Sequence, residues 1–63
     1  MKNYVELVSM PDGQKTAFMV DQIAVVVRDT TGGCLVILNS GLKQRVQEEY
    51  QEVLRKMDAR RLR

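Results

Sequence analysis

The residues that could perform covalent chemistry in this chain are few and stand apart from one another. The sequence holds one cysteine, Cys34, and no histidine. A side-chain nucleophile needs an adjacent base to activate it, and neither Ser9 nor Ser40 has such a base nearby in the sequence. Cys34 lies in an apolar run, where a thiol is more often an inert core group than a reactive one. We therefore predict no catalytic nucleophile.

The eight carboxylates show no pairing typical of acid–base catalysis. Asp12 and Asp29 fit turn positions, and three glutamates fall together near the start of a helical segment, at Glu48, Glu49 and Glu52. With no histidine and no second thiol, we expect neither a tetrahedral metal site nor a cofactor. We therefore predict a protein that is not an enzyme.

A loop of threonine and glycine is the best candidate for binding a small ligand. Backbone N–H groups in such a loop can hold a phosphate, although this one lacks the lysine-bearing pattern of phosphate-binding loops, and an ordinary hairpin loop is the favoured interpretation. In an oligomer, several copies of the loop and nearby cations could converge on a small anionic ligand such as a nucleotide. The candidate ligand-binding residues are Arg28, Thr30, Thr31, Gly32, Lys43 and Arg45.

Positive charge gathers at the C-terminal end of the chain, although the net charge is only +2. Cations near the end of a helix are favoured by the helix dipole, and this explanation is preferred over a tail that contacts nucleic-acid phosphates. Aromatic side chains on which bases could stack are scarce. Five of the ten basic residues lie in the last nine positions, at Arg55, Lys56, Arg60, Arg61 and Arg63.

The length of 63 residues allows one domain, 1–63, with a thin core. Domains of this size usually need a disulfide, a metal or a partner subunit for stability. Since a single cysteine cannot form a disulfide within the chain, we expect a homo-oligomer. The lone thiol also indicates a reducing compartment, and no apolar run is long enough to span a bilayer. We expect a cytoplasmic protein with no membrane partner.

The chain divides into a strand-rich part, 1–46, and a helix, 47–63, with a basic tip, which predicts an α+β fold. Alternation and β-branched residues predict an antiparallel sheet of four to five strands, over residues 4–10, 15–20, 23–28, 34–38 and 42–46. Turns fall at Pro11-Asp12-Gly13 and Asn39-Ser40-Gly41. Apolar residues follow helical spacing at Val46, Tyr50, Val53, Leu54, Met57 and Leu62, and no standard N-cap residue marks the helix start.

The central strand pair is apolar on both of its faces. A single helix can cover only one face, so the other face is expected to meet a second copy of the sheet. The alternative is a sheet that curls into a small barrel around that face. The expected oligomer interface consists of Val25, Val27, Leu35 and Ile37.

Short motifs along most of the chain resemble the flagellar FlbD family of small bacterial proteins. They are Asp12-Gly13, Asp21-Gln22-Ile23, Leu38-Asn39-Ser40-Gly41, Val46, Glu48 and Glu52-Val53. The resemblance implies a small regulatory or accessory protein. The chain is also similar in length and strand pattern to the carbon-storage RNA-binding regulators, which form β-intertwined dimers. Glu49 stands near the position of an arginine that serves RNA binding in those regulators.

Three functional hypotheses follow. The favoured one is a small homo-oligomeric binding or regulatory protein that acts through a protein partner. The alternative is an oligomeric module, of a phage or accessory type, that sequesters a small anionic ligand such as a nucleotide signal at subunit interfaces. The third and least favoured is a nucleic-acid-binding regulator that uses its basic residues.

Overall fold

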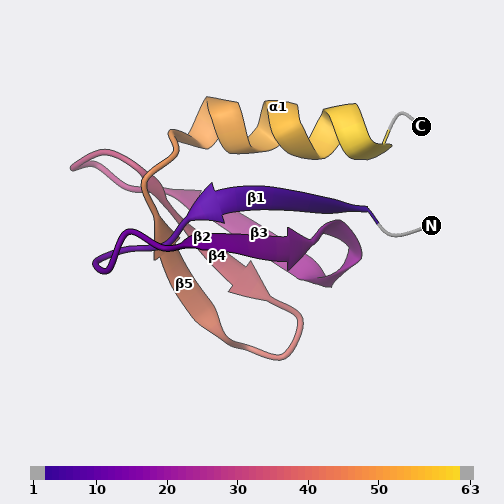
Figure 1. The fold of residues 1–63 in the computed structure, drawn as a ribbon, viewed down its shortest axis with the longest axis horizontal. Helices are drawn as coiled ribbons and strands as arrows, with labels where there is room; N and C mark the ends of the chain where they lie inside the picture. The colour runs from indigo at the N-terminus through magenta and orange to yellow at the C-terminus, as the bar shows by residue number, and fades with distance from the viewer. Residues whose placement is uncertain (1–2, 62–63) are drawn as a thin grey trace.

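The computed structural model describes residues 3–61 and shows a small α+β fold (Figure 1). Two of the predicted strands have the expected bounds, and the turn glycines Gly13 and Gly41 have positive φ angles of 73° and 96°. The elements are β1 Tyr4–Val8, β2 Lys15–Met19, the 3-10 helix η1 Val20–Gln22, β3 Ile23–Arg28, β4 Cys34–Leu38, β5 Lys43–Val46 and the helix α1 Tyr50–Arg61.

Three other strands are slightly shorter than predicted. The strand expected over 4–10 ends at Val8, because Ser9 already closes the turn by accepting the Gly13 N–H at 2.8 Å. The strand expected over 15–20 ends at Met19, where η1 begins. The strand expected over 42–46 starts at Lys43, because the Leu42 carbonyl closes the turn with Leu38.

The helix begins at Tyr50, three residues later than the predicted start at Gln47. The intervening residues bind β1 instead: the Gln47 N–H donates to the Val8 carbonyl at 2.9 Å, and the Glu48 carboxylate accepts the Val8 N–H. The first helical bond runs from the Val53 N–H to the Glu49 carbonyl. Residues 62 and 63 of the predicted tip lie outside the described part of the chain.

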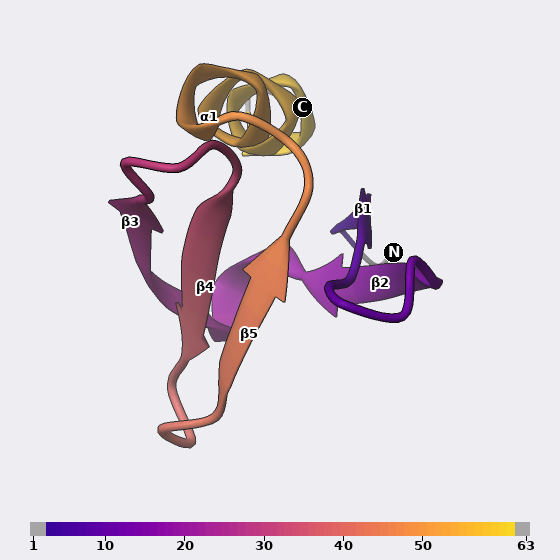
Figure 2. The same cartoon turned by 90° about the vertical axis from the view of Figure 1, so that its left-hand side faces the viewer.

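The strands form two antiparallel sheets instead of the single predicted sheet. One contains β1 and β2, and the other has the order β3-β4-β5. A bridge between Ser9 and Val46 joins them, and the Met10 N–H donates there to the Arg45 carbonyl at 2.8 Å. Figure 2 shows the three-stranded sheet with the β1–β2 hairpin beside β5 and α1 across one end. The two sheets can therefore fold over a common interior.

This interior buries one face of each sheet and one stripe of the helix. The sequence analysis expected the helix alone to cover one face of the sheet. In the structure, the β1–β2 hairpin and α1 together cover the inner face of β4. Most of the helical stripe is as predicted, with Tyr50 half-buried beside the core. The buried apolar side chains are Val5, Leu7, Phe18, Val20, Cys34, Val36, Val46, Val53 and Met57.

The loop between β3 and β4 passes close to the end of β5. Gly33 has a φ of 73°, and a Cβ atom at this position would collide with the Val46 carbonyl oxygen. Only glycine adopts this positive φ with little strain and has no Cβ atom to collide with the carbonyl. Gly33 therefore fixes the approach of the loop to β5.

Candidate binding surfaces

The four side chains of the expected oligomer interface lie on one face of the three-stranded sheet. Val25 is opposite Ile37, and Val27 is opposite Leu35. Directly opposed residues of antiparallel strands point to the same side, and Cys34 and Val36, which alternate with them on β4, are buried. Val25, Val27, Leu35 and Ile37 therefore form one apolar surface, called here the outer patch, which faces away from the core.

No described part of the chain folds back over the outer patch. Val25 and Val27, on the edge strand β3, keep 47% and 43% of their surface exposed, although valine is usually a buried residue. Lys43 is opposite Ile37 and Arg45 is opposite Leu35, so two cations border the patch along β5. The sheet therefore does not curl around the outer patch into the small barrel that the sequence allowed as an alternative.

In the loop after β3, the carboxylate of Asp29 is bound by neighbouring groups of the chain. Asp29 accepts the Thr31 N–H at 3.0 Å and the Thr31 hydroxyl at 2.8 Å, and it forms an ion pair with Arg45. The hydrogen bonds from Thr31, and secondarily the charge of Arg45, hold the pKa of Asp29 below its ordinary value. The carboxylate is therefore ionised at neutral pH.

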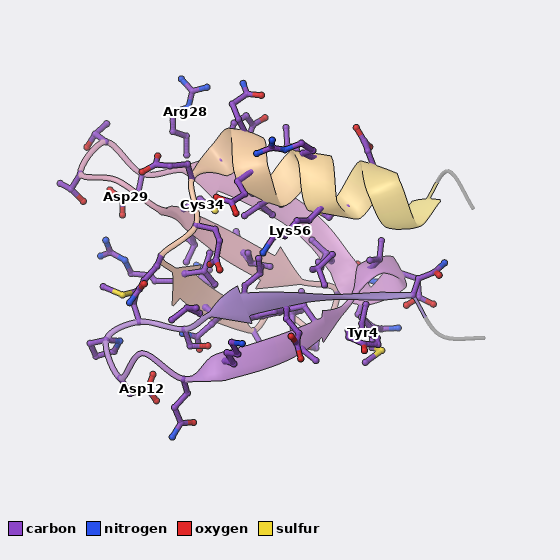
Figure 3. The ribbon with its side chains drawn as sticks, turned by 45° about the horizontal axis from the view of Figure 1, so that its top comes forward. Tyr4, Asp12, Arg28, Asp29, Cys34 and Lys56 are labelled. Atoms are coloured by element: carbon purple, nitrogen blue, oxygen red, sulfur yellow. The ribbon has the colours of Figure 1, made fainter. Side chains whose placement is uncertain are left out.

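The structure brings together some of the predicted ligand-binding residues and separates others. Thr31, Gly32 and Arg45 line a shallow cavity of about 180 Å³, and Thr30 lies in the same exposed loop. Lys43 lies at the other end of β5. The guanidinium of Arg28 stands 5.0 Å from the ring centre of Tyr50, beside the start of α1 (Figure 3).

The groups that could hold an anion in this loop already contact carboxylates of the chain. Asp29 forms an ion pair with Arg45 and accepts a hydrogen bond from Thr31. The Gly33 N–H donates to Glu49 Oε2 at 3.5 Å. A small anion would have to displace at least one of these carboxylates. Binding of such a ligand stays a prediction.

Cys34 is buried between the sheets and the helix, and it is free. Burial raises the pKa of its thiol, and the nearby carboxylates of Glu48, Glu49 and Asp29 raise it further. The protonated thiol is a poor nucleophile, which agrees with a structural role.

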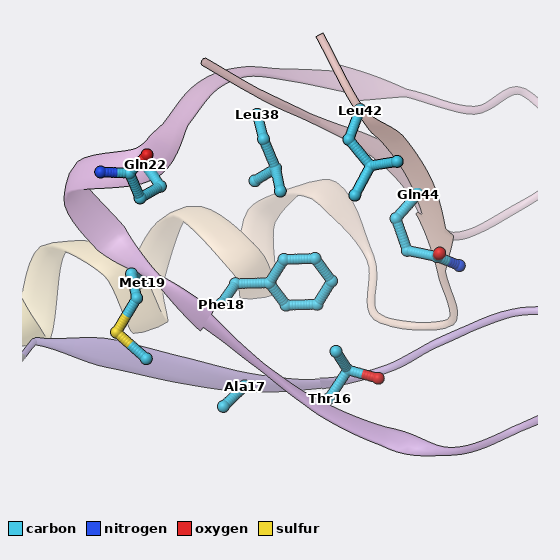
Figure 4. A pocket seen from close by; sticks show the side chains of 8 residues that line it. All are labelled: Thr16, Ala17, Phe18, Met19, Gln22, Leu38, Leu42 and Gln44. Carbon is cyan, nitrogen blue, oxygen red and sulfur yellow. The ribbon is translucent and has the colours of Figure 1, made fainter. Parts of the chain in front are cut away.

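A second cavity, which the sequence did not predict, lies between β2 and the β4–β5 turn (Figure 4). Its volume is about 260 Å³. Phe18 points into it between Leu38, Leu42 and Gln44, as Figure 4 shows. No pattern in the sequence marks it, because it results from the angle at which the two sheets meet. The lining residues are Thr16, Ala17, Phe18, Met19, Gln22, Leu38, Leu42 and Gln44.

Among the described residues, no group of three or more cysteine, aspartate or glutamate side chains is placed to hold a metal ion. The same part of the chain contains no helix that is both long and apolar enough to cross a membrane. Comparisons of the chain with protein-family models, curated proteins and solved structures gave no match. The two family resemblances therefore stay predictions.

Proposed function

We propose that the protein is a small non-enzymatic binding protein that works as a homo-oligomer, with the outer patches of two copies packed against each other. The observation that carries this proposal is the joint exposure of Val25 and Val27 beside Leu35 and Ile37 on one sheet face. Leaving adjacent apolar side chains in water is unfavourable by about 25 cal/mol per Å².

A second copy is the occupant that fits this face best. A two-fold dimer places the same patch on both sides of the interface, so an apolar centre is self-complementary. The cationic border at Lys43 and Arg45 would lie at the rim, where charged side chains keep contact with water. A chain of 63 residues also gains stability from a partner subunit.

In this proposal the oligomer acts in the cytoplasm by presenting other surfaces to a protein partner. The buried, uncharged thiol of Cys34 suits a reducing compartment.

Light scattering coupled to gel filtration tests the oligomer directly. We expect the wild-type chain to be a dimer at micromolar concentration and Val27→Glu to be a monomer with an unchanged circular dichroism spectrum. Thr30→Glu adds the same charge at an exposed loop position outside the patch and should remain dimeric. A wild-type chain that is monomeric at micromolar concentration would contradict the proposal.

Sequestration of a small anionic ligand is the second candidate function, favoured by the cavity that brings Thr31, Gly32 and Arg45 together. A ligand that binds the folded state raises the melting temperature. Melting curves with inorganic phosphate and with a nucleoside monophosphate test this candidate. Asp29→Asn should strengthen any such binding, because it frees Arg45 and removes a competing negative charge.

A further inference from the structure

The outer face of the three-stranded sheet changes from apolar to charged across its width. On this face β3 presents Val25 and Val27, and β5 presents Lys43 and Arg45. The two valines are exposed, whereas the apolar side chains of β4 that lie between the two outer strands are half-buried. Interfaces place apolar side chains at the centre and charged ones at the rim. The centre of the proposed interface therefore lies at β3, on one edge of the sheet.

The edge of β3 is free over most of the strand. The strand order β3-β4-β5 gives β3 a neighbour on one side only, and Figure 2 shows it at the margin of the molecule. A bulge interrupts the register between Ile23 and Val25, so the regular free edge is the run 25–28. Residues 23–27 include neither a charged residue nor a proline, two devices with which proteins commonly protect an edge.

The hydrogen-bond register shows which backbone groups face the free edge. The Asp29 N–H donates to the Gly33 carbonyl at 3.3 Å. Since bonded pairs alternate along an antiparallel pair, the odd-numbered residues of β3 bind β4. The register of β4 agrees, because its even-numbered residues bind β5. The N–H and C=O groups of Val26 and Arg28 therefore point away from β4, and they have no partner among residues 3–61.

The edges of two other strands are covered by the chain itself. On β1, the Val8 N–H donates to the Glu48 carboxylate at 3.0 Å. On β5, the Arg45 carbonyl accepts the Met10 N–H at 2.8 Å. The β2 edge is also open, but it belongs to the other sheet and does not border the outer patch. Among the described strands, β3 therefore has the open edge that adjoins the exposed valines.

An interface centred on β3 would remove the free backbone groups from water. Buried N–H and C=O groups are costly unless they are paired. A second β3, antiparallel across a two-fold axis beside Val27, supplies the partners, because it pairs Val26 of each copy with Arg28 of the other. Every outward N–H and C=O of these two residues is then bonded, Val27 lies opposite the partner's Val27, and no like charges face each other.

We propose that two copies of the chain pair through β3, so that their three-stranded sheets continue as one antiparallel sheet. The outer patches then contact each other along their β3 margins. Lys43 and Arg45 lie at the far edges of the joined sheet, in water. The inference rests on the proposed dimer and specifies how its copies meet.

A cysteine placed beside the two-fold axis tests the register. Val27 and its counterpart would form a non-hydrogen-bonded pair, with Cα atoms about 4.5 Å apart, and a disulfide needs roughly 4.4–6.8 Å. We expect Val27→Cys to become a disulfide-linked dimer in oxidised glutathione, as non-reducing electrophoresis would show. Val25→Cys is the matched control, because it lies on the same face of β3 but away from the axis, and it should form little linked dimer. The wild type controls for Cys34, which is buried.

Amide hydrogen exchange tests the backbone pairing without a substitution. In the wild-type dimer, the amides of Val26 and Arg28 should exchange much more slowly than in the monomeric variant Val27→Glu, because paired amides are protected. Packing of the patches without pairing of the edges would leave both amides in water. They would then exchange rapidly in dimer and monomer alike.

A backbone modification removes the donor and keeps the side chain. Since Gly33 precedes the single cysteine, Cys34, the chain can be assembled from two synthetic segments by native chemical ligation. N-methylation of Arg28 should abolish the dimer. N-methylation of Ala17 should leave it intact, because the Ala17 N–H faces the β2 edge: the even-numbered residues of β2 bind β1.

The outcomes separate this inference from the proposed oligomer. A wild-type dimer with rapidly exchanging amides at Val26 and Arg28 would overturn the β3 pairing alone. Equal disulfide linkage of Val25→Cys and Val27→Cys, or none in Val27→Cys, would do the same. A wild type that is monomeric at micromolar concentration would overturn both proposals and leave the β3 edge to a strand of another protein.

Discussion

The Glu48 carboxylate receives the backbone N–H of Val8 on both of its oxygens, at 3.0 Å and 3.2 Å. Lys56 of α1 lies 4.0 Å from the same carboxylate and donates to the Glu6 carbonyl. Figure 3 shows Lys56 projecting from the helix toward β1. Glu48, just before α1, and Lys56, within α1, thus hold the helix against the edge strand β1. Glu48 and Val8 are separated by 40 positions in the sequence.

Replacement of Glu48 by alanine should destabilise the protein, because the Val8 N–H would lose its acceptor in a partly buried place. We expect a loss of about 1–3 kcal/mol in the free energy of unfolding, measured by urea denaturation. Glu52→Ala is the matched control: Glu52 pairs with Lys56 only at 3.9 Å on an exposed helix face, and its loss should cost less than about 1 kcal/mol. Equal losses in the two variants would contradict the role given to Glu48.

Two glycines with the same backbone angle offer a sharper comparison. Gly13 and Gly33 both have a φ of 73°, but an added Cβ meets nothing within 4 Å at Gly13 and collides with the Val46 carbonyl at Gly33. Gly13→Ala should therefore cost only the left-handed penalty of about 1–2 kcal/mol. Gly33→Ala should cost clearly more, since the loop must also move away from β5. Chemical denaturation of both variants checks this, and similar costs would show that the loop yields freely.

Most of the strands could be predicted because local signals agree with the fold. The β-branched residues of 23–28 and the apolar run 34–38 give β3 and β4 their observed bounds. Proline, aspartate and glycine mark the first turn. The helix start could not be predicted, because Glu48 and Gln47 are held by β1, a contact that no local pattern reveals.

Of the two candidate binding surfaces, the outer patch could be predicted from the sequence and the cavity beside β2 could not. The outer patch was predictable, since a strand with apolar residues at every position must expose one face of a thin sheet to a partner or to solvent. The cavity beside β2 was not, because it combines residues of β2, η1 and the β4–β5 turn. Its position depends on how the Ser9–Val46 bridge sets one sheet against the other.

The thiol of Cys34 should resist modification in the native protein. Only 1% of the residue is exposed, and its raised pKa keeps the thiol protonated at neutral pH. We expect iodoacetamide to leave the folded protein unlabelled at neutral pH and to label it completely in urea, as mass spectrometry would show. Rapid labelling without denaturant would contradict the buried position.

The hydrogen bonds of Asp29 make the order of its loop dependent on pH. Because the pKa of Asp29 is lower in the folded state than in the unfolded chain, the ionised form stabilises the fold above the ordinary carboxyl pKa of about 4. This contribution is lost as the pH falls through the folded-state pKa. NMR titration of the Asp29 carboxyl carbon and the Thr31 amide should show one shared transition below pH about 4.

Substitutions of Thr31 and Arg45, the two partners of Asp29, test the cause of the lowered pKa of Asp29. Thr31→Val removes the hydroxyl bond but keeps the backbone bond, and Arg45→Gln removes the opposite charge and keeps both Thr31 bonds. Each change removes an interaction that favours the carboxylate, so each should raise the pKa of Asp29 part of the way toward its ordinary value. An unchanged transition in both variants would mean that neither contact persists in solution. In that case Arg45 would be free to bind an anion, which would strengthen the second candidate function.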